Sequence, residues 1–203
     1  MPGQKGVGGQ RRSGRRGGNM NCRVFMVIDL DRCWGCRACE VACKQELGLG
    51  VGPRPMKVEE TGARLLESAL HRDFIPTLCQ HCDRAECLAA CPEDAICRET
   101  DGTIQVKRDS CTGCGACVTA CPFSVMEMDG ERGLPVKCTL CRERRTDGAL
   151  PSCAQHCPGR AITLGAEEEL AGLLQGRHSW KTGRIVYVSD KWAQLGAALQ
   201  RQA

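Results

Sequence analysis

The chain contains few large aromatic side chains. Among its 203 residues there are three Phe, one Tyr and three Trp. Aromatic side chains normally supply a large share of the apolar surface buried in a core. A chain of this length predicts one or two compact domains. Such domains need another source of stability for the folded state.

Long apolar runs are also missing. No stretch approaches the roughly 18 consecutive apolar residues of a membrane-spanning helix, so we expect membrane attachment only through a partner. Arg11-Arg12 and Arg15-Arg16 resemble a twin-arginine export signal, but no apolar segment follows them. We therefore expect a disordered Gly/Arg-rich tail over residues 1–21, with Met20 as an alternative start. The expected location is cytoplasmic, and co-export to the periplasm with a signal-bearing partner is the alternative.

Cysteine, by contrast, is abundant, with 18 residues. This density indicates a disulfide or metal framework, and disulfides require an oxidising compartment that the N-terminal sequence does not favour. The formal net charge is +4.

Sixteen of the cysteines form four groups, and Cys22 and Cys97 remain outside them. Groups one and three have the spacing C-x2-C-x2-C-x3-C, group two has C-x2-C-x4-C-x3-C, and group four has C-x2-C-x11-C-x3-C. A proline follows groups two, three and four. In chain order the groups are Cys33, Cys36, Cys39, Cys43; Cys79, Cys82, Cys87, Cys91; Cys111, Cys114, Cys117, Cys121; and Cys138, Cys141, Cys153, Cys157.

This spacing is typical of [4Fe–4S] sites. Three close cysteines wrap one cluster, and the fourth projects away and serves a second cluster. A zinc site needs only two separated C-x2-C pairs and has no use for the third loop cysteine. Zinc therefore stays the weaker alternative, and it is most acceptable at group four with its long spacer. The sequence predicts four [4Fe–4S] clusters. Each cluster with its thiolates carries a charge of about −2, so the loaded protein is mildly acidic and the formal net charge of +4 gives no support for nucleic-acid binding.

An internal repeat supports this interpretation. Residues 31–43 and 109–121 share Asp, all four Cys, two Ala and the glycine pair Gly35/Gly113, and glycine at that site permits a positive φ beside a cluster. The expected fold class is α+β, with duplicated bacterial-ferredoxin-like units and little regular secondary structure. We predict strands at 24–30, 95–96, 104–106, 125–128, 135–137, 161–164 and 184–188, and helices at 167–174 and 191–199. The turns Asp101-Gly102 and Asp129-Gly130 each lie between two of these strands and predict two hairpins.

Over residues 24–164 these motifs resemble the four-cluster electron-transfer subunits that accompany molybdenum or tungsten pterin enzymes of the dimethyl sulfoxide reductase type. The spacings of groups two and four and the sequences at 29–36 and 136–141 carry the resemblance. It implies nested ligand sets, each with three cysteines of one group and the last cysteine of another. The sets are Cys33, Cys36, Cys39 with Cys157; Cys79, Cys82, Cys87 with Cys121; Cys111, Cys114, Cys117 with Cys91; and Cys138, Cys141, Cys153 with Cys43.

The resemblance also implies a division of the chain into two lobes. The segments are an outer ferredoxin-like lobe at 22–43 plus 133–164, an insertion at 44–78, an inner ferredoxin-like lobe at 79–132 and a C-terminal extension at 165–203. The cysteine-free insertion is expected to be a surface loop that bridges two units, or a partner contact.

The predicted function is electron transfer without catalysis, to or from a large molybdenum or tungsten pterin subunit, with a membrane anchor as a second candidate partner. A hydrogenase or carbon monoxide dehydrogenase complex is the alternative setting. A zinc-binding regulatory protein is the alternative from another class, and an independent enzyme lacks support because no catalytic constellation stands out. His81 and His156 lie inside cysteine motifs, where we expect them to hydrogen-bond or pack rather than bind iron. Arg142, Arg144 and Arg145 either offset cluster charge, dock a partner or form a solvated loop.

Overall fold

The computed structural model describes residues 23–66, 69–193 and 195–200. The predicted tail at 1–21 and Cys22 lie outside the described residues. The mixture of short strands and short helices agrees with the predicted α+β class.

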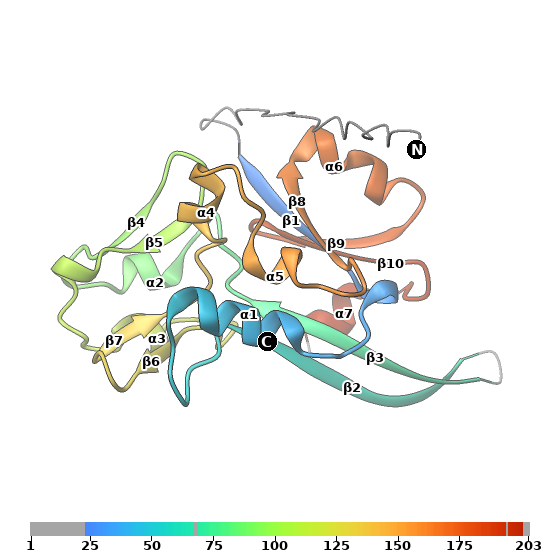
Figure 1. The fold of residues 1–203 in the computed structure, drawn as a ribbon, viewed down its shortest axis with the longest axis horizontal. Coiled ribbons are helices and arrows are strands. Elements are labelled where there is room, and N and C mark those ends of the chain that lie inside the picture. The colour runs from blue at the N-terminus through green and yellow to red at the C-terminus, as the bar shows by residue number, and fades with distance from the viewer. Residues whose placement is uncertain (1–22, 67–68, 194, 201–203) are drawn as a thin grey trace, which may run out of the picture.

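The largest sheet among the described residues has four strands in the order β8-β1-β10-β9 (Figure 1). Strand β1 (Val24–Asp29) pairs antiparallel with β8 (Ile162–Ala166) and parallel with β10 (Ile185–Ser189). Strand β9 (His178–Thr182) pairs antiparallel with β10. Both central strands are buried on their two faces, which explains their unbroken apolar sequences.

The two faces of this sheet meet different neighbours, because side chains alternate along a strand. Phe25 and Val27 pack with Leu170 of helix α6 (Glu167–Leu174) on one face. Met26 and Ile28 face the other side, where they share a core with several cysteines. The sheet therefore connects directly to the cysteine groups.

The C-terminal segment is part of this sheet. The prediction treated residues 165–203 as an extension, but β10 lies between β1 and β9, and β9 forms the sheet edge. The predicted strand at 184–188 and helix at 167–174 are confirmed. The final helix, α7 (Leu195–Gln200), begins later than expected.

The cysteine-free segment at 44–78 is largely a long hairpin rather than a loop. Strands β2 (Met56–Leu66) and β3 (Ala69–Leu78) pair antiparallel over most of their length. Met56 and Leu78 at the base of the hairpin are buried, and the far end projects away from the other elements (Figure 1). The glycines and prolines at 50–55 suggested a loop, and they occupy only the approach to the first strand.

Two small hairpins form the other end of the molecule, as the turns Asp101-Gly102 and Asp129-Gly130 predicted. They consist of β4 (Ile96–Arg98) with β5 (Ile104–Val106), and β6 (Glu127–Asp129) with β7 (Leu134–Val136). The remaining elements are short turns of helix around the cysteines: η1 (Leu30–Arg32), α1 (Ala38–Leu47), α2 (Glu86–Ala89), η2 (Arg108–Ser110), α3 (Ala116–Thr119), α4 (Arg142–Thr146) and α5 (Ser152–Gln155). None of the helices in the described part of the chain has both the length and the apolar character needed to cross a membrane.

Candidate functional site

The repeated loops of groups one and three have the same local structure. Each begins with a 3-10 turn, in which the backbone N–H of Cys33 or Cys111 donates to the carbonyl oxygen three residues earlier, at 3.2 Å in both loops. Each then continues into a helix, α1 or α3, that carries the third cysteine, Cys39 or Cys117, toward the interior, and the longer α1 also carries the fourth, Cys43. The sequence repeat is therefore also a structural repeat over these residues.

The glycine expected to permit positive φ does so in both loops. Gly35 has φ +67° and Gly113 has φ +73°. Both sites are closely packed. A Cβ on Gly113 would lie 2.2 Å from the carbonyl oxygen of Gly133, and a Cβ on Gly35 would lie 2.5 Å from the ring of Phe74. Two residues later, Arg37 and Gly115 both have left-handed φ, at 60° and 77°. At this position the group-one loop therefore accepts an arginine side chain where the group-three loop has glycine.

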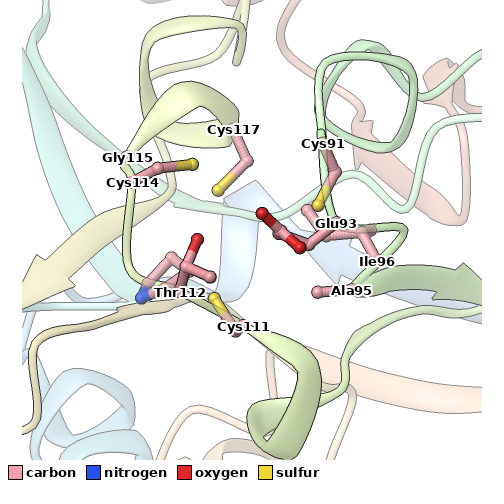
Figure 2. A pocket seen from close by; sticks show the side chains of 10 residues that line it. Cys91, Glu93, Ala95, Ile96, Cys111, Thr112, Cys114, Gly115 and Cys117 are labelled. Atoms are coloured by element: carbon pink, nitrogen blue, oxygen red, sulfur yellow. The ribbon is translucent and has the colours of Figure 1, made fainter.

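Group three forms one pocket with the last cysteine of group two. Cys111, Cys114 and Cys117 line it together with Cys91, and Figure 2 shows Cys91 on the opposite side from the group-three loop. Ile96 supplies part of the apolar lining. Cys114 is exposed, so this site lies close to the molecular surface.

Group two forms a second pocket with the last cysteine of group three. Cys79, Cys82, Cys87 and Cys121 line it, and most of its other walls are apolar. These walls include Ile104, Phe123, Val125 and Met126, and one cation, Lys137, also reaches the lining.

Group one forms a third pocket, which it shares with the last cysteine of group four. Its sulfur-bearing residues are Cys33, Cys36, Cys39 and Cys157. Trp34 also lines this pocket, although 66 % of the residue remains exposed. Cys36 is the exposed member of this set, in the position equivalent to Cys114.

The remaining four cysteines lie together in the most buried part of the molecule. Cys43, Cys138 and Cys153 are buried and Cys141 is half-buried. Burial, and then the proximity of Cys138 and Cys141, raises the pKa of Cys43. The same causes, with Cys43 among the neighbours, raise the pKa of Cys153. Contacts between α1 and α5 hold this set in place.

The donors fit a cluster better than a single metal ion. Among the described residues, no three Cys, His, Asp or Glu side chains converge as ligands of one ion, whereas thiolates around zinc lie about 2.3 Å from it. A four-iron cluster instead needs four thiolates spread around separate iron corners in an apolar setting, and the pockets have this form. Backbone N–H groups also reach two sulfurs, with Leu140 donating to Cys138 Sγ and Ala161 to Cys157 Sγ at 3.3 Å each.

Burial favours the protonated form of several of these thiols. Burial raises the pKa of Cys82 to about 11 and the pKa of Cys39 and Cys138 to about 12. A thiol must lose its proton to bind iron, so loading these pockets releases protons and stabilises the fold.

The two motif histidines hydrogen-bond and pack. His81 is fully buried, and its Nδ1 accepts a hydrogen bond from the backbone N–H of Ile104 at 2.9 Å. His156 Nδ1 lies 2.9 Å from the carbonyl oxygen of Ser152. Cys97 is half-buried and lies outside the three cysteine pockets described above.

The arginines of α4 are ion-paired rather than free in a solvated loop. Arg142 pairs with Glu99 at 3.1 Å, Arg144 with Glu46 at 3.2 Å and Arg145 with Asp101 at 2.6 Å. These pairs connect the group-four segment to neighbouring elements, and the Arg145–Asp101 pair is largely shielded from water.

Two polar residues at the site had no sequence signal beyond their position beside a cysteine. Glu40, next to Cys39, is buried, and its Oε1 accepts a hydrogen bond from the backbone N–H of Val58 at 2.6 Å. Lys137, next to Cys138, is buried and lines the group-two pocket. A charged residue beside a ligand looks like ordinary surface until the fold buries it.

Comparison with known proteins gives consistent matches. The model of a 4Fe-4S dicluster domain matches residues 70–167, and that of a 4Fe-4S binding domain matches residues 30–48. The thiosulfate reductase electron transfer subunit PhsB of Salmonella typhi is 37% identical over 149 residues, covering 72% of this chain and 78% of the relative. A tetrathionate reductase subunit of Salmonella typhimurium is 35% identical over 156 residues, covering 74% of this chain and 61% of the relative.

The iron-sulfur subunit of the nitrate-inducible formate dehydrogenase of Escherichia coli is 34% identical over 174 residues, covering 76% of this chain and 58% of the relative. The chain therefore spans about three fifths of the length of the tetrathionate reductase and formate dehydrogenase subunits.

Proposed function

The chain belongs to the family of [4Fe–4S] iron–sulfur subunits of the dimethyl sulfoxide reductase type, and on that premise we propose that it carries electrons through four [4Fe–4S] clusters to or from a molybdenum or tungsten pterin catalytic subunit. The clusters supply one-electron oxidation and reduction. The polypeptide binds them, separates them from water and sets their potentials through hydrogen bonds and nearby charge.

The observation that carries this proposal is the composition of the cysteine pockets. Each of the three pockets contains three cysteines of one group and the last cysteine of another, and the remaining four cysteines lie together. This arrangement supports the nested ligand sets and, with them, two ferredoxin-like lobes built from duplicated units.

The exposure of the cysteines supports an assignment of which clusters exchange electrons with partners and which connect the others. Cys36 and Cys114 are exposed, whereas the cysteines of group four and Cys79 are buried or half-buried. In this proposal the group-one and group-three clusters exchange electrons with partners, and the group-two and group-four clusters connect them.

The related proteins favour the partner class. The relatives named above belong to two reductases and a formate dehydrogenase, which favours a large catalytic oxidoreductase subunit over a hydrogenase or carbon monoxide dehydrogenase. The chain itself is then a non-catalytic subunit. We place the complex in the cytoplasm, with or without a membrane anchor, and fractionation of cells with a tagged chain distinguishes this from co-export to the periplasm.

The test is oxygen-free affinity purification from the native host. About 16 iron and 16 acid-labile sulfide per chain, with molybdenum or tungsten in a large co-purifying subunit, is the expected result. Nickel in the co-purifying subunit moves the protein to the alternative complexes. Zinc without labile sulfide overturns the electron-transfer proposal.

A further inference from the structure

Lys137 is a buried cation between two of the cysteine sites. It directly precedes Cys138 of group four, and its side chain lines the pocket of Cys79, Cys82 and Cys87. Only 3% of the residue is exposed. It therefore faces the group-two site while its own backbone continues into the group-four site.

The partners of this ammonium group are neutral. Lys137 Nζ donates to the carbonyl oxygen of Ile104, and to the carbonyl oxygen of Cys138 at 3.1 Å. Within the described ranges, no carboxylate lies at ion-pair distance from it. Arg184, a second cation that is deeply buried in the described part of the chain, has Asp83 at 3.5 Å.

Such a cation needs a negative charge nearby. Removing an ammonium group from water is strongly unfavourable, and uncharged hydrogen-bond partners offset only part of that cost. Besides cysteine sulfur and apolar walls, the lining of this pocket includes Gln80 and Glu86, and Glu86 is exposed to water and forms no ion pair with Lys137 among the described residues. A four-iron cluster with four thiolates carries a charge of about −2, so it supplies the missing counter-charge.

His81 does not share this positive charge. Its Nδ1 accepts the backbone N–H of Ile104, so the ring is neutral at that nitrogen. The same residue, Ile104, receives the Lys137 ammonium on its carbonyl oxygen. Arg98 also donates to the backbone of this loop, at the carbonyl oxygens of Cys82 and Asp83, but it is exposed and its charge is screened by water.

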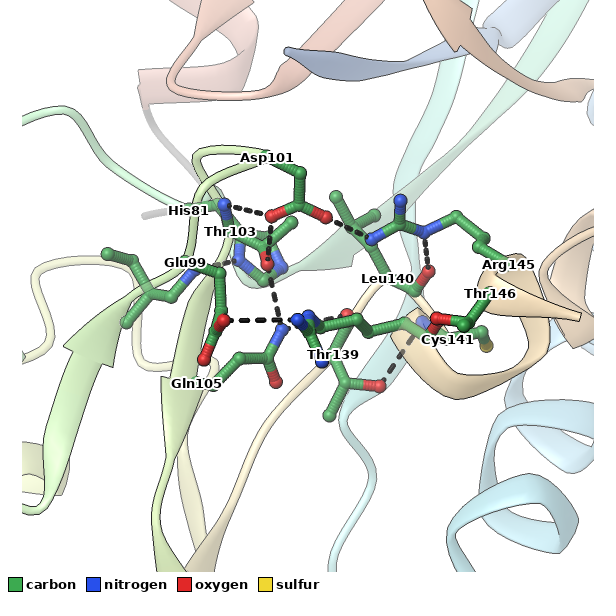
Figure 3. Close-up of polar contacts among 12 residues, drawn as sticks. His81, Glu99, Asp101, Thr103, Gln105, Thr139, Leu140, Cys141, Arg145 and Thr146 are labelled. Carbon is green, nitrogen blue, oxygen red and sulfur yellow. Dashed lines mark hydrogen bonds and ion pairs between the residues drawn. The ribbon is translucent and has the colours of Figure 1, made fainter. Parts of the chain in front are cut away.

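Hydrogen bonds to the backbone just after Lys137 fix the segment that carries it. Gln105 Nε2 donates to the carbonyl oxygen of Thr139 at 3.1 Å, and Arg145 Nε donates to that of Leu140 at 2.8 Å while it pairs with Asp101 (Figure 3). These contacts attach the β4–β5 hairpin to the segment that begins group four. The ammonium therefore stays between the two sites.

We propose that Lys137 is a fixed counter-charge shared by the group-two and group-four clusters, and that it raises the reduction potential of both. The inference rests on the proposed cluster function. Reduction adds one electron to each cluster, and a nearby positive charge stabilises the more negative, reduced form. Lys137 thus keeps the two connecting clusters reducible although none of their cysteines is exposed to water.

Three variants separate the charge from the hydrogen bond. Lys137→Gln removes the charge and keeps a donor for Ile104, Lys137→Met removes both, and Lys137→Arg keeps the charge. The control is Lys181→Gln, which removes an exposed lysine on β9 that pairs with Glu167 at the surface. Each is prepared as the full chain in its complex, and cluster midpoint potentials are measured by redox titration with electron paramagnetic resonance.

We expect two of the four midpoints to fall in both neutral variants, by about tenfold in the reduction equilibrium, which is ~59 mV for one electron. Lys137→Arg and Lys181→Gln keep the wild-type midpoints. Unchanged midpoints in Lys137→Gln, with shifts only in Lys137→Met, overturn the proposal, because Lys137 then acts through its hydrogen bond alone. Equal shifts in Lys181→Gln overturn it as well.

Iron and labile sulfide are counted first. Loss of iron in both neutral variants with full iron in Lys137→Arg supports the proposal, since the charge is then required to hold the anionic clusters. Loss in all three variants overturns it. A wild-type chain without labile sulfide refutes the cluster function itself, which separates that failure from a failure at Lys137.

Discussion

Substitution of Gly113 by alanine tests the close approach in the group-three loop. Gly113 has φ +73°, and a Cβ there would meet the carbonyl oxygen of Gly133 at 2.2 Å. Gly115, in the same loop, has φ +77°, and no neighbouring atom lies within 4 Å of the place that its Cβ would take. Gly115→Ala is therefore a matched control, which imposes the backbone strain without the clash.

The two substitutions differ by the clash alone. A non-glycine residue in the left-handed region costs about 1–2 kcal/mol, and both variants lose this much. Arg37 shows that the position of Gly115 accepts a side chain, because it has the equivalent place in the group-one loop with φ 60°. Overpacking adds about 1–3 kcal/mol at Gly113. The backbone N–H of Gly133 donates a hydrogen bond to the carbonyl oxygen of Asp129 at 2.8 Å, so the Gly133 carbonyl has little freedom to move away from the added Cβ.

The assay is thermal bleaching of the visible cluster absorbance at one scan rate, with iron counted beforehand. A difference of about 2 kcal/mol lowers the midpoint of Gly113→Ala by about 4–8 °C relative to Gly115→Ala for a chain of this size. We also expect Gly113→Ala to lose about four of 16 iron, those of the group-three cluster. Equal midpoints and equal iron in the two variants would show that the Gly133 carbonyl moves aside and that the close approach imposes no constraint.

Three further predictions concern other parts of the molecule. Glu40→Ala leaves the buried N–H of Val58 without its carboxylate acceptor and lowers the free energy of unfolding by about 1.5–3 kcal/mol. The control Glu60→Gln breaks an exposed ion pair with Arg72 and lowers the free energy of unfolding by about 0–1 kcal/mol. Equal losses of stability for the two variants in thermal scans would refute the role of Glu40. Cys157→Ser removes about four of 16 iron and Cys97→Ser removes none, as counted after oxygen-free purification; full iron in Cys157→Ser contradicts the nested ligand sets. Burial raises the pKa of Tyr187 from 10.0 to about 12, so the folded state keeps its proton where the unfolded state has lost it, and stability falls by up to about 2.7 kcal/mol as pH rises from 10 to 12. Tyr187→Phe lacks this alkaline loss, and parallel pH-dependent melting curves for both proteins would argue against it.

The sequence predicted well those parts of the fold in which local chemistry decides the structure. The positive φ of Gly35 and Gly113 followed from the repeat, and both small hairpins followed from Asp-Gly turns between apolar residues. The α+β class followed from the short segments between cysteine groups. In each case the deciding residues are neighbours in the chain.

Other features depend on contacts between distant residues, which a sequence does not display. The place of β10 between β1 and β9 is a pairing across more than 150 residues for Met26 and Ile185. The alternation of the β2–β3 hairpin was obscured by nearby glycines and prolines. The burial of Lys137 and Glu40 arises only when a pocket wall and a hairpin close over them.

The position of β10 also has a consequence for how the protein is made. The cysteines of the group-two and group-three pockets all lie between residues 79 and 121, so they leave the ribosome together. The group-one pocket needs Cys33 and Cys157, and its supporting strand β1 gains its second neighbour only when Ile185–Ser189 have been synthesised. The cysteines of the group-two and group-three pockets are therefore complete once Cys121 has been synthesised, whereas the group-one pocket lacks its last cysteine until Cys157 and its supporting sheet until β10.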